Sequence, residues 1–516
     1  MINKVKTVAL DGMEGLLVEI ETDISNNLPY FDIIGLADAS VKEAAQRVKR
    51  AIINSGYDYP RGKITVNLSP AYVHKKGSHY DLGIAIGVLL ASGSIVCDTD
   101  NILFIGELSL NGDILPSKAV LPMLISVLEN GGSGVREIIL ARDNCAECYL
   151  LTKGTNIKLI PAINLKSVVE HVQGTKLSMY QEKFNYERPL SNLDFEDVKG
   201  QNFAKEAITT AVAGNHNLLL IGPPGSGKTM LARRIPTVLP EMTLKEQIET
   251  TKIYSYAGKL TKQMPIISER PFRHLSSNIT SSSLVGGGNA VIPGEVSFAH
   301  NGVLFWDEMF ETSRKILEQL RVPLSEKSVH IIRNGRSVVF PSNFILVGAS
   351  NPCKCGFLGD ENRFCTCTQT EINTYRNKLS GPMADRIDMA IEIGRVNYRE
   401  LEEKNPLAKN ISSDEMKKVI EKVRMIQKER FEKYDFKWNG DIDDKHISTF
   451  CKLDSEGEKF MESLYSKNCL SPRRYYKILK IARTVADING KDNISTQNLA
   501  VAFHYTRFLA ERNGME

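Results

Sequence analysis

The chain has 516 residues, of which 42% are hydrophobic and 24% are charged, and its formal net charge is +4. Such a length is enough for about three domains of ordinary size. The composition excludes a disordered or fibrous protein, because enough apolar side chains are present to fill a core. The weakly basic charge permits contact with nucleic acid but does not indicate it, since dedicated binders usually carry a stronger local patch.

The first ten residues (MINKVKTVAL) lack the basic and apolar runs of a signal peptide. Residues 82–96 form the most apolar stretch, but glycines and serines interrupt it and it is too short to cross a bilayer. It therefore predicts a buried helix. We expect a cytoplasmic protein with no membrane partner, in which the nine cysteines are reduced thiols or metal ligands.

Hydrophobic periodicity divides the chain into three segments and a linker. Residues 1–175 alternate β-rich runs with helical patterns, and residues 176–192 are polar and without periodicity, which predicts a linker. Residues 193–396 form a second α/β segment, and residues 397–516 carry Lys, Glu, Arg and Leu at helical spacing. In the first segment, strands are predicted at 5–10, 16–20 and 64–68, and a helix at 39–55.

A glycine-rich string, GPPGSGKT at 222–229, follows the apolar run 217–221 and precedes a predicted helix. Its glycines let backbone N–H groups curl around a polyphosphate, Lys228 can neutralise the outer phosphates, and Thr229 can ligate Mg²⁺. The helix beginning near Lys228 adds its positive end. In this setting the string predicts a nucleotide site, not a glycine-rich turn without a ligand. The predicted binding residues are Gly222, Pro223, Pro224, Gly225, Ser226, Gly227, Lys228 and Thr229.

Two further apolar runs end in polar side chains. The run at 301–308 (NGVLFWDE) ends in Asp307 and Glu308, which match the magnesium-holding and water-activating acids of a P-loop ATPase. Alone, such a strand end would indicate nothing, but its position downstream of a P-loop favours the functional interpretation. The run at 343–347 is followed by Asn351, which either orients the attacking water or caps the turn before Pro352.

Residues 328–340 (SVHIIRNGRSVVF) contain two alternating runs around an Asn-Gly pair, which is a strong signal for a β-hairpin. Arg333 and Arg336 flank the predicted tip. They are candidate DNA contacts, because arginines there can bind phosphates. Ordinary surface arginines are the alternative.

Four of the cysteines form two close pairs separated by a loop, and they are Cys353, Cys355, Cys365 and Cys367. Two such pairs can supply a tetrahedral thiolate site for Zn²⁺. The single residue inside each pair makes the spacing tighter than usual, and four reduced loop thiols are the alternative. The sequence leaves both interpretations open.

Several longer strings resemble the Mg-chelatase-like AAA+ family, and in particular its ComM/YifB-type members. They are DFEDVKGQ at 194–201, RPFR at 270–273, PGEVSFAHNG at 293–302, NPCKCG at 351–356 and SGPMADRID at 380–388. The resemblance covers nearly the whole chain. It implies an α/β protein with a P-loop AAA+ core at 193–396 and a C-terminal helical lid at 397–516. The family's Pro-His-His element is replaced by a segment that begins at His274, which leaves the role of a histidine there open.

The resemblance also assigns catalytic roles. Asn351 matches sensor 1, Arg386 matches the arginine finger that reaches a neighbouring subunit's ATP, and Arg473 matches the sensor 2 arginine of the lid. Fixed cations of this kind stabilise the charge of phosphoryl transfer. Without the resemblance, Arg386 would be interpreted as an ion-pair partner of Asp385 or Asp388, and Arg473 as a solvated residue on a helix.

Residues 1–175 resemble the Lon-protease-like domain, of the ribosomal S5 type, in KKGSHYDLG at 75–83 and GELSLNGDILP at 106–116. A working protease of this type needs a serine nucleophile and a lysine base. Ser78 stands where proline is usual, and Lys118 is only close to the usual lysine position. We therefore expect a non-proteolytic scaffold or substrate-handling domain.

Taken together, the resemblance implies an ATP-hydrolysing AAA+ motor that uses ATP and Mg²⁺ and assembles into a ring, expected to be a hexamer. Its expected partner is branched or single-stranded DNA, as in ComM-type branch migration during recombination of incoming DNA. The alternatives are a motor subunit of a metal chelatase and a Lon-like ATP-dependent protease. The fused Lon-like domain and the absence of an integrin-type metal domain favour the DNA motor.

Overall fold

The computed structural model describes residues 3–129, 134–153, 155–181, 193–288, 291–333, 336–360, 362–396, 410–467 and 470–511. Its contacts divide the chain into two compact units. Unit 1 contains Met1–Glu187, Thr243–Ser268 and His330–Phe340, and unit 2 contains Arg188–Met242, Glu269–Val329 and Pro341–Glu516. The expected domain boundaries near 175, 192 and 396 stay predictions, because residues 182–192 and 397–409 lie outside the described ranges.

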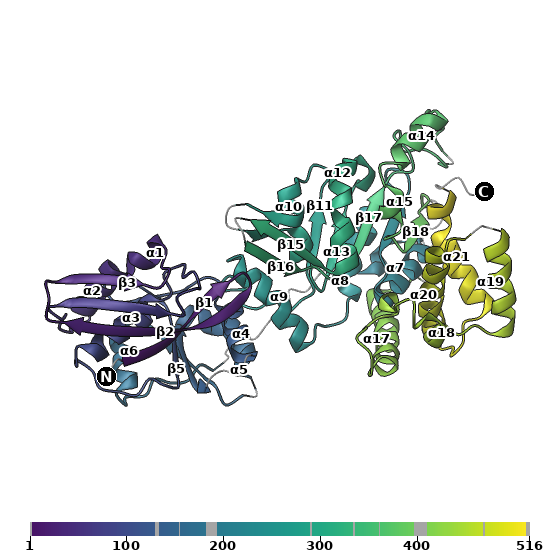
Figure 1. Ribbon diagram of the computed structural model, residues 1–516. Coiled ribbons are helices and arrows are strands. Elements are labelled where there is room, and N and C mark those ends of the chain that lie inside the picture. The colour runs from purple at the N-terminus through teal and green to yellow at the C-terminus, as the bar shows by residue number, and fades with distance from the viewer. Residues whose placement is uncertain are drawn as a thin grey trace. The chain divides into compact units, whose positions relative to one another are not determined.

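Unit 1 is built around a seven-stranded mixed sheet with the order β3-β4-β2-β1-β5-β8-β9 (Figure 1). β2 is antiparallel to both β1 and β4, and the remaining neighbours in the sheet are parallel. The strands are β1 (Asn3–Asp11), β2 (Glu14–Ser25), β3 (Tyr30–Ile34), β4 (Lys63–Ser69), β5 (Ile102–Ile105), β8 (Glu137–Ala141) and β9 (Lys158–Ala162). The three predicted strands at 5–10, 16–20 and 64–68 are confirmed as parts of β1, β2 and β4.

Helices cover both faces of this sheet. Successive side chains of a strand point to opposite sides, so each face carries apolar residues that the helices bury. Val5 and Ala9 of β1 join one apolar cluster, and Val8 joins another. The helices of unit 1 are α1 (Ala39–Lys42), α2 (Ala44–Asn54), α3 (Asp81–Ala91), α4 (Val120–Glu129), α5 (Cys145–Thr152), α6 (Leu165–Val172) and α9 (Leu244–Tyr256), with β6 (Glu107–Leu108) and β7 (Ile114–Leu115) as a short ribbon.

Two predicted helices of unit 1 differ from the structure at their limits. The helix predicted at 39–55 is interrupted at Glu43, so that α1 and α2 are separate. The apolar stretch at 82–96 does form a buried helix, α3, but this helix ends at Ala91. Gly93 follows with φ +74°, a left-handed conformation that commonly ends helices.

Unit 2 contains a five-stranded sheet with the order β11-β14-β17-β10-β18, and every pair of neighbours is parallel. The strands are β10 (Leu218–Ile221), β11 (Phe272–Leu275), β14 (Val303–Trp306), β17 (Ile345–Ser350) and β18 (Met389–Glu392). The shorter helices are α8 (Lys228–Val238), α10 (Ser281–Val285), α11 (Glu295–Phe298), α12 (Arg314–Leu317), α13 (Arg321–Glu326), α14 (Gln369–Arg376), α15 (Gly381–Ala384) and α18 (Ile447–Phe450). The longer helices are α7 (Asn202–Gly214), α17 (Ser413–Arg430), α19 (Ser455–Lys467), α20 (Pro472–Ile488) and α21 (Thr496–Glu511).

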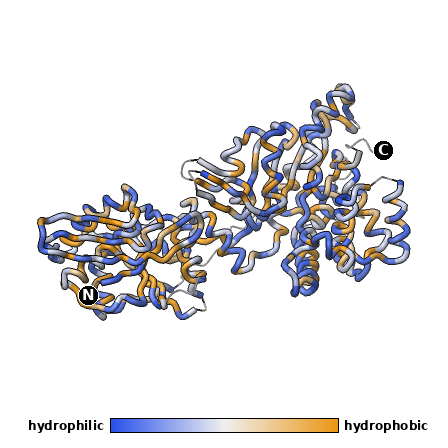
Figure 2. The backbone as a smooth tube through the Cα atoms, viewed as in Figure 1, coloured by the Kyte–Doolittle hydropathy of each residue, from blue (hydrophilic) through white to orange (hydrophobic). Residues whose placement is uncertain are grey.

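The C-terminal helices share one core with the parallel sheet. In α17 the buried residues Met416, Ile420 and Val423 recur every three or four positions, which places them on one side of the helix. The hydrophilic and hydrophobic colours of α17 alternate accordingly in Figure 2. Strand residues such as Leu220 belong to the same apolar cluster as Ile481 of α20. Among the described helices, none combines the length and apolar character needed to cross a bilayer.

A buried carboxylate holds these helices together. Asp487 of α20 is 2% exposed. It accepts hydrogen bonds from Nη1 and Nη2 of Arg430 in α17 at 2.7 and 2.6 Å. Arg483 and Asn439 donate to the same carboxylate at 3.1 and 2.8 Å. These fixed donors offset the cost of burying a carboxylate in a core from which water is excluded.

Replacing Asp487 by alanine should therefore destabilise unit 2 by about 3–5 kcal/mol, since Arg430 and Arg483 would keep their charges without the carboxylate that pairs with them. Urea unfolding followed by tryptophan fluorescence measures this, because both tryptophans, Trp306 and Trp438, belong to unit 2. Lys418→Ala is the control. It breaks the exposed ion pair with Asp414 and should leave the unfolding midpoint nearly unchanged. Equal midpoints for the two variants would contradict the role given to Asp487.

Candidate functional site

Three neighbouring strands of unit 2 end in polar groups at the same edge of the sheet. β14, β17 and β10 lie side by side and run in parallel. The glycine-rich string follows β10, Asp307 and Glu308 follow β14, and Asn351 follows β17. In parallel α/β sheets, ligands bind at this carboxyl edge. The fold therefore brings the groups predicted from separate strand ends into one place.

The loop at 222–229 has the backbone of a phosphate cradle. Gly225 and Gly227 have φ of +80° and +90°, which a residue with a Cβ adopts only with strain. α8 begins directly after this turn at Lys228, so its first N–H groups face the loop. Gly222 lies against the exit of β18, where a Cβ would come within 2.2 Å of the carbonyl oxygen of Ile393. The N–H of Gly222 donates to the carbonyl oxygen of Ser350 in β17 at 3.2 Å, so the start of the loop is held between β17 and the exit of β18.

Lys228 connects this loop to the end of β17. Its ammonium group donates to the carbonyl oxygens of Gly222 and Pro223 at 2.7 and 3.0 Å, and to Oδ1 of Asn351 at 3.3 Å. Burial lowers the pKa of Lys228, and the negative charge of Asp307 opposes this shift. A partly desolvated cation is attracted strongly by an anion. Lys228 is therefore suited to binding phosphate.

Thr229 and Asp307 meet directly. The hydroxyl of Thr229 donates to Oδ2 of Asp307 at 3.0 Å, and the backbone N–H of Glu308 donates to Oδ1 at 3.0 Å. A hydroxyl and a carboxylate oxygen are ligands that Mg²⁺ accepts beside phosphate oxygens and water. The donor set therefore fits the magnesium ion of a P-loop ATPase.

Glu308 lies beside this pair with an exposed side chain and a positive φ of 50°. Such a conformation is uncommon for residues other than glycine and is often found where a side chain must be aimed. His274 was not predicted as part of the site. It lies in β11 with Nε2 at 4.0 Å from Oδ2 of Asp307 and its ring stacked on Phe305. Little in the sequence points to His274, because β11 is only four residues long and carries Arg273 as well.

Arg386 lies toward the opposite edge of the sheet. Its guanidinium group donates to Arg321, Ser325 and Pro382 at 3.0, 2.8 and 2.7 Å. Its carbonyl oxygen accepts a hydrogen bond from Asn217, which precedes β10, whereas the P-loop follows β10. Asn217 donates this bond from its side-chain amide. Since a strand rises about 3.3 Å per residue, Asn217 is about 16 Å from the start of the P-loop.

Arg473 lies beside Arg386. Nη1 of Arg473 donates to Asp385 at 3.3 Å, while Asp388 accepts the backbone N–H of Asn217 at 2.8 Å. Burial, followed by the charges of Arg321 and Arg473, lowers the pKa of Arg386. The described contacts of Arg473 thus group it with Arg386, not with Lys228.

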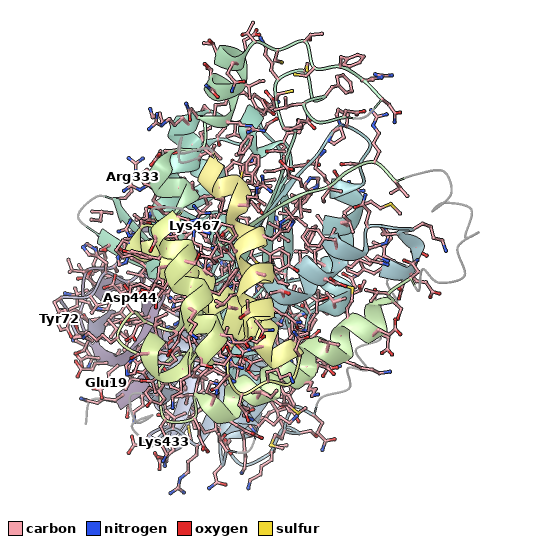
Figure 3. All side chains as sticks on the ribbon, turned by 90° about the vertical axis from the view of Figure 1, so that its right-hand side faces the viewer. Glu19, Tyr72, Arg333, Lys433, Asp444 and Lys467 are labelled. Atoms are coloured by element: carbon pink, nitrogen blue, oxygen red, sulfur yellow. The ribbon has the colours of Figure 1, made fainter. Side chains whose placement is uncertain are left out.

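The hairpin predicted at 328–340 is present as a two-stranded sheet of β15 (Ser328–Arg333) and β16 (Arg336–Pro341). The side chain of Arg333 is exposed (Figure 3). The predicted tip, 334–335, and the side chain of Arg336 lie outside the described residues. Arg333 has no described contact with Lys228.

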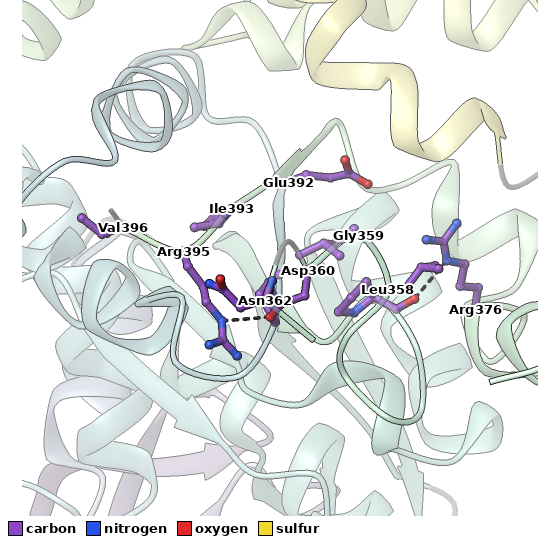
Figure 4. Close-up of a pocket in the computed structure, with 14 residues that line it drawn as sticks. Leu358, Gly359, Asp360, Asn362, Arg376, Glu392, Ile393, Arg395 and Val396 are labelled. Carbon is purple, nitrogen blue, oxygen red and sulfur yellow. Dashed lines mark hydrogen bonds and ion pairs between the residues drawn. The ribbon is translucent and has the colours of Figure 1, made fainter. Parts of the chain in front are cut away.

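The four predicted zinc ligands, hereafter the cysteine cluster, come together beyond β17. They are Cys353, Cys355, Cys365 and Cys367. All four sulfur atoms lie within 4.8 Å of one another. The loop that carries them also borders a cavity of about 580 Å³ beside the P-loop (Figure 4). Gly222 and Pro223 line one part of this cavity, and Asp360, paired with Arg395 at 2.9 Å, lines another.

In unit 1, the hydroxyl of Ser78 donates to Glu107. Lys75, three positions before Ser78, donates instead to the carbonyl oxygen of Pro70. The side chain of Lys118 lies next to Gly258, where an added Cβ would come within 3.3 Å of it. The described contacts therefore give Ser78 a carboxylate partner and not a lysine.

Comparison with known proteins gives three family matches. "Magnesium chelatase, subunit ChlI" matches residues 194–401, "Subunit ChlI of Mg-chelatase" matches 20–144, and "Magnesium chelatase, subunit ChlI C-terminal" matches 410–506. Competence protein ComM of Haemophilus influenzae is 38% identical over 501 residues, which are 96% of this chain and 95% of that protein. The chain belongs to the ComM/YifB-type, Mg-chelatase-like family. Membership implies an AAA+ ATPase that uses ATP and Mg²⁺.

Other relatives differ in how much of the chain they match. The YifB protein of Escherichia coli is 38% identical over 507 residues, covering 97% of this chain and 96% of its own length. The magnesium-chelatase 67 kDa subunit of Chlorobaculum parvum is 28% identical over 170 residues, which are 31% of this chain and 23% of that subunit. The likeness to ComM and YifB therefore extends over both units, whereas that to the chelatase subunit is local.

Lys228→Ala should reduce ATP turnover at least about 100-fold, since fixed charge at the phosphates is lost. Phosphate release at saturating ATP and Mg²⁺ measures this. Arg233→Ala is the matched control, because Arg233 is exposed on the same helix α8, and its turnover should be unchanged. Normal turnover by Lys228→Ala would refute the site.

Proposed function

We propose that this ComM/YifB-type protein is an ATP-hydrolysing ring motor that moves branched or single-stranded DNA. The observation that carries the proposal is the meeting of Lys228, Thr229, Asp307 and Asn351 at one edge of the parallel sheet. This arrangement provides groups for phosphate, for a divalent cation and for the γ-phosphoryl group in a single site.

Each group has a proposed role in hydrolysis. The P-loop backbone and Lys228 hold the β- and γ-phosphates, and Asn351, which is bonded to Lys228, orients the attacking water. Glu308 accepts a proton from that water, since its carboxylate is exposed next to Asp307. Mg²⁺, held through Thr229 and Asp307, would neutralise charge that develops on the phosphate oxygens.

Arg386 and Arg473 are proposed to serve the ATP site of a neighbouring subunit. The two arginines are neighbours, and the backbone of Arg386 is bonded to the side chain of Asn217 at the edge of the sheet opposite to its own P-loop. An arginine supplied in trans completes the site only when subunits assemble head to tail, and such contacts form a ring when the rotation between neighbours closes. We propose a hexamer on the family resemblance.

DNA is proposed as the substrate on two grounds. The relative that matches 96% of the chain is named a competence protein. Arg333 is exposed at the end of β15, and Arg336 begins β16, so both arginines adjoin the hairpin tip. Such a pair can hold backbone phosphates without reading the sequence. The hairpin and the glycine-rich loop near 285–290 would be the elements that face the central pore.

The remaining predictions complete this proposal. Residues 1–175 would form a non-proteolytic, Lon-like domain that handles substrate, since Ser78 is bonded to Glu107 and not to a lysine. The motor would work in the cytoplasm, where DNA is available. Zinc is the third predicted cofactor. The cysteine cluster would bind it, at a different place from Mg²⁺.

A DNA-dependent ATPase assay tests the substrate. Branched or single-stranded DNA should stimulate ATP hydrolysis, and Arg333→Glu combined with Arg336→Glu should abolish the stimulation while basal turnover stays within about twofold. The control is Arg50→Glu combined with Arg61→Glu, which makes the same charge change at exposed positions elsewhere. Equal stimulation of both double variants would refute the hairpin as a DNA contact. Stimulation by a porphyrin precursor but not by DNA would favour a chelatase-type motor.

Mixing two inactive variants tests the shared site. Arg386→Ala keeps its P-loop, and Lys228→Ala keeps its arginine. At equal amounts, about a quarter of the interfaces should pair an intact P-loop with an intact arginine, so about a quarter of the normal ATP turnover should return. If Arg386 acts within its own subunit, mixing the two variants should restore no ATP turnover.

A further inference from the structure

The four sulfur atoms of the cysteine cluster are arranged like the ligands of a single metal ion. Sγ of Cys353 lies 3.4 Å from Sγ of Cys355 and 3.6 Å from that of Cys365, and the latter two are 3.5 Å apart. Sγ of Cys367 accepts the backbone N–H of Cys355 at 3.4 Å. A tetrahedral Zn²⁺ with Zn–S distances of about 2.3 Å places its sulfurs about 3.8 Å apart. Disulfides would require about 2.05 Å.

The loop that carries the cluster has no helix or strand among its described residues. Between the end of β17 at Ser350 and the start of α14 at Gln369, the described residues form only turns and bends. Loops of this length without helix or strand are uncommon in compact domains. Cys353 is fully buried, and the other three cysteines of the cluster are half-buried. A metal ion that joins the two cysteine pairs would close this loop and fix its conformation.

The same loop touches the nucleotide site. Cys353 is two residues beyond Asn351, the acceptor of the Lys228 hydrogen bond. Gly356 packs against Pro224 of the P-loop so closely that a Cβ would come within 2.9 Å of the proline ring. The N–H of Gly356 donates to the carbonyl oxygen of Cys353 at 3.0 Å, so this contact is tied to the cluster. Any change in the conformation of the cluster would therefore alter the position of Asn351 and the contact with the P-loop.

We propose that the cysteine cluster binds one zinc ion, and that this ion holds Asn351 in the position from which it meets Lys228. The ion takes no part in the chemistry of hydrolysis. It is a structural metal, because four thiolates leave no coordination position open. The cysteines are accordingly positioning residues. The second half of this proposal rests on the proposed ATPase, whereas the first half does not.

Metal analysis of the full-length protein tests the binding. Protein purified without chelator should contain about one zinc ion per chain, and Cys365→Ala should contain almost none. Cys97→Ser is the matched control, because Cys97 is a half-buried thiol outside the cluster, and it should keep its zinc. Cobalt(II) added in place of zinc should give the visible spectrum of a tetrahedral thiolate complex. Full-length protein without zinc and without that cobalt spectrum would overturn the site.

Steady-state kinetics tests the positioning. Cys365→Ala should lower kcat about tenfold and change KM less than kcat, since no residue of the P-loop is altered. Cys365→His replaces one zinc ligand by another, and should recover both the zinc and most of kcat. A general loss of folding would instead lower the melting temperature of unit 2 without rescue by histidine.

The outcomes separate this proposal from the proposed function. Zinc bound in a protein that never hydrolyses ATP would overturn the ATPase assignment but keep the metal site. ATP hydrolysis by a protein that binds no zinc would overturn the metal site alone. Zinc lost in Cys365→Ala with an unchanged kcat would overturn the positioning role.

Discussion

The nucleotide site depends on one constraint, which is that β14, β17 and β10 run in the same direction side by side. Only this arrangement lets the residues after three separate strands converge, because the carboxyl ends of parallel strands share an edge. The register is strict, since Leu218 pairs with Val347 and Val303 pairs with Ile345. A slip of one residue would turn the strand's side chains to the wrong face and would move Asp307 away from Thr229.

Much of the site could be predicted because its signals are local. A glycine string after an apolar run, or two acids at the end of one, identifies a strand end without knowledge of the rest of the fold. The distances among Lys228, Asp307 and Asn351 then follow from parallel pairing. Local signals also predicted the hairpin and the first strands of unit 1. The roles of Arg386 and Arg473, however, were supplied by family resemblance, and the roles of all these residues stay predictions.

What could not be predicted is set by contacts between distant segments. Nothing near Arg473 indicates that it lies beside Arg386, 87 positions earlier, because that proximity depends on how α20 packs on the sheet. His274 reaches Asp307 only through the pairing of β11 with β14. The tight spacing of the cysteines left zinc undecided, and only the folded loop brings the four sulfurs together.

The discontinuous course of the chain affects how the protein can fold during synthesis. Unit 1 takes its last segment from His330–Phe340, so it lacks part of its structure until about two thirds of the chain has left the ribosome. Its α9 segment, with Ile253 fully buried, is encoded inside the stretch that otherwise builds unit 2. A truncated chain that begins at residue 188 would therefore expose apolar surface from α9, and it would be prone to aggregate even if the ATP site formed.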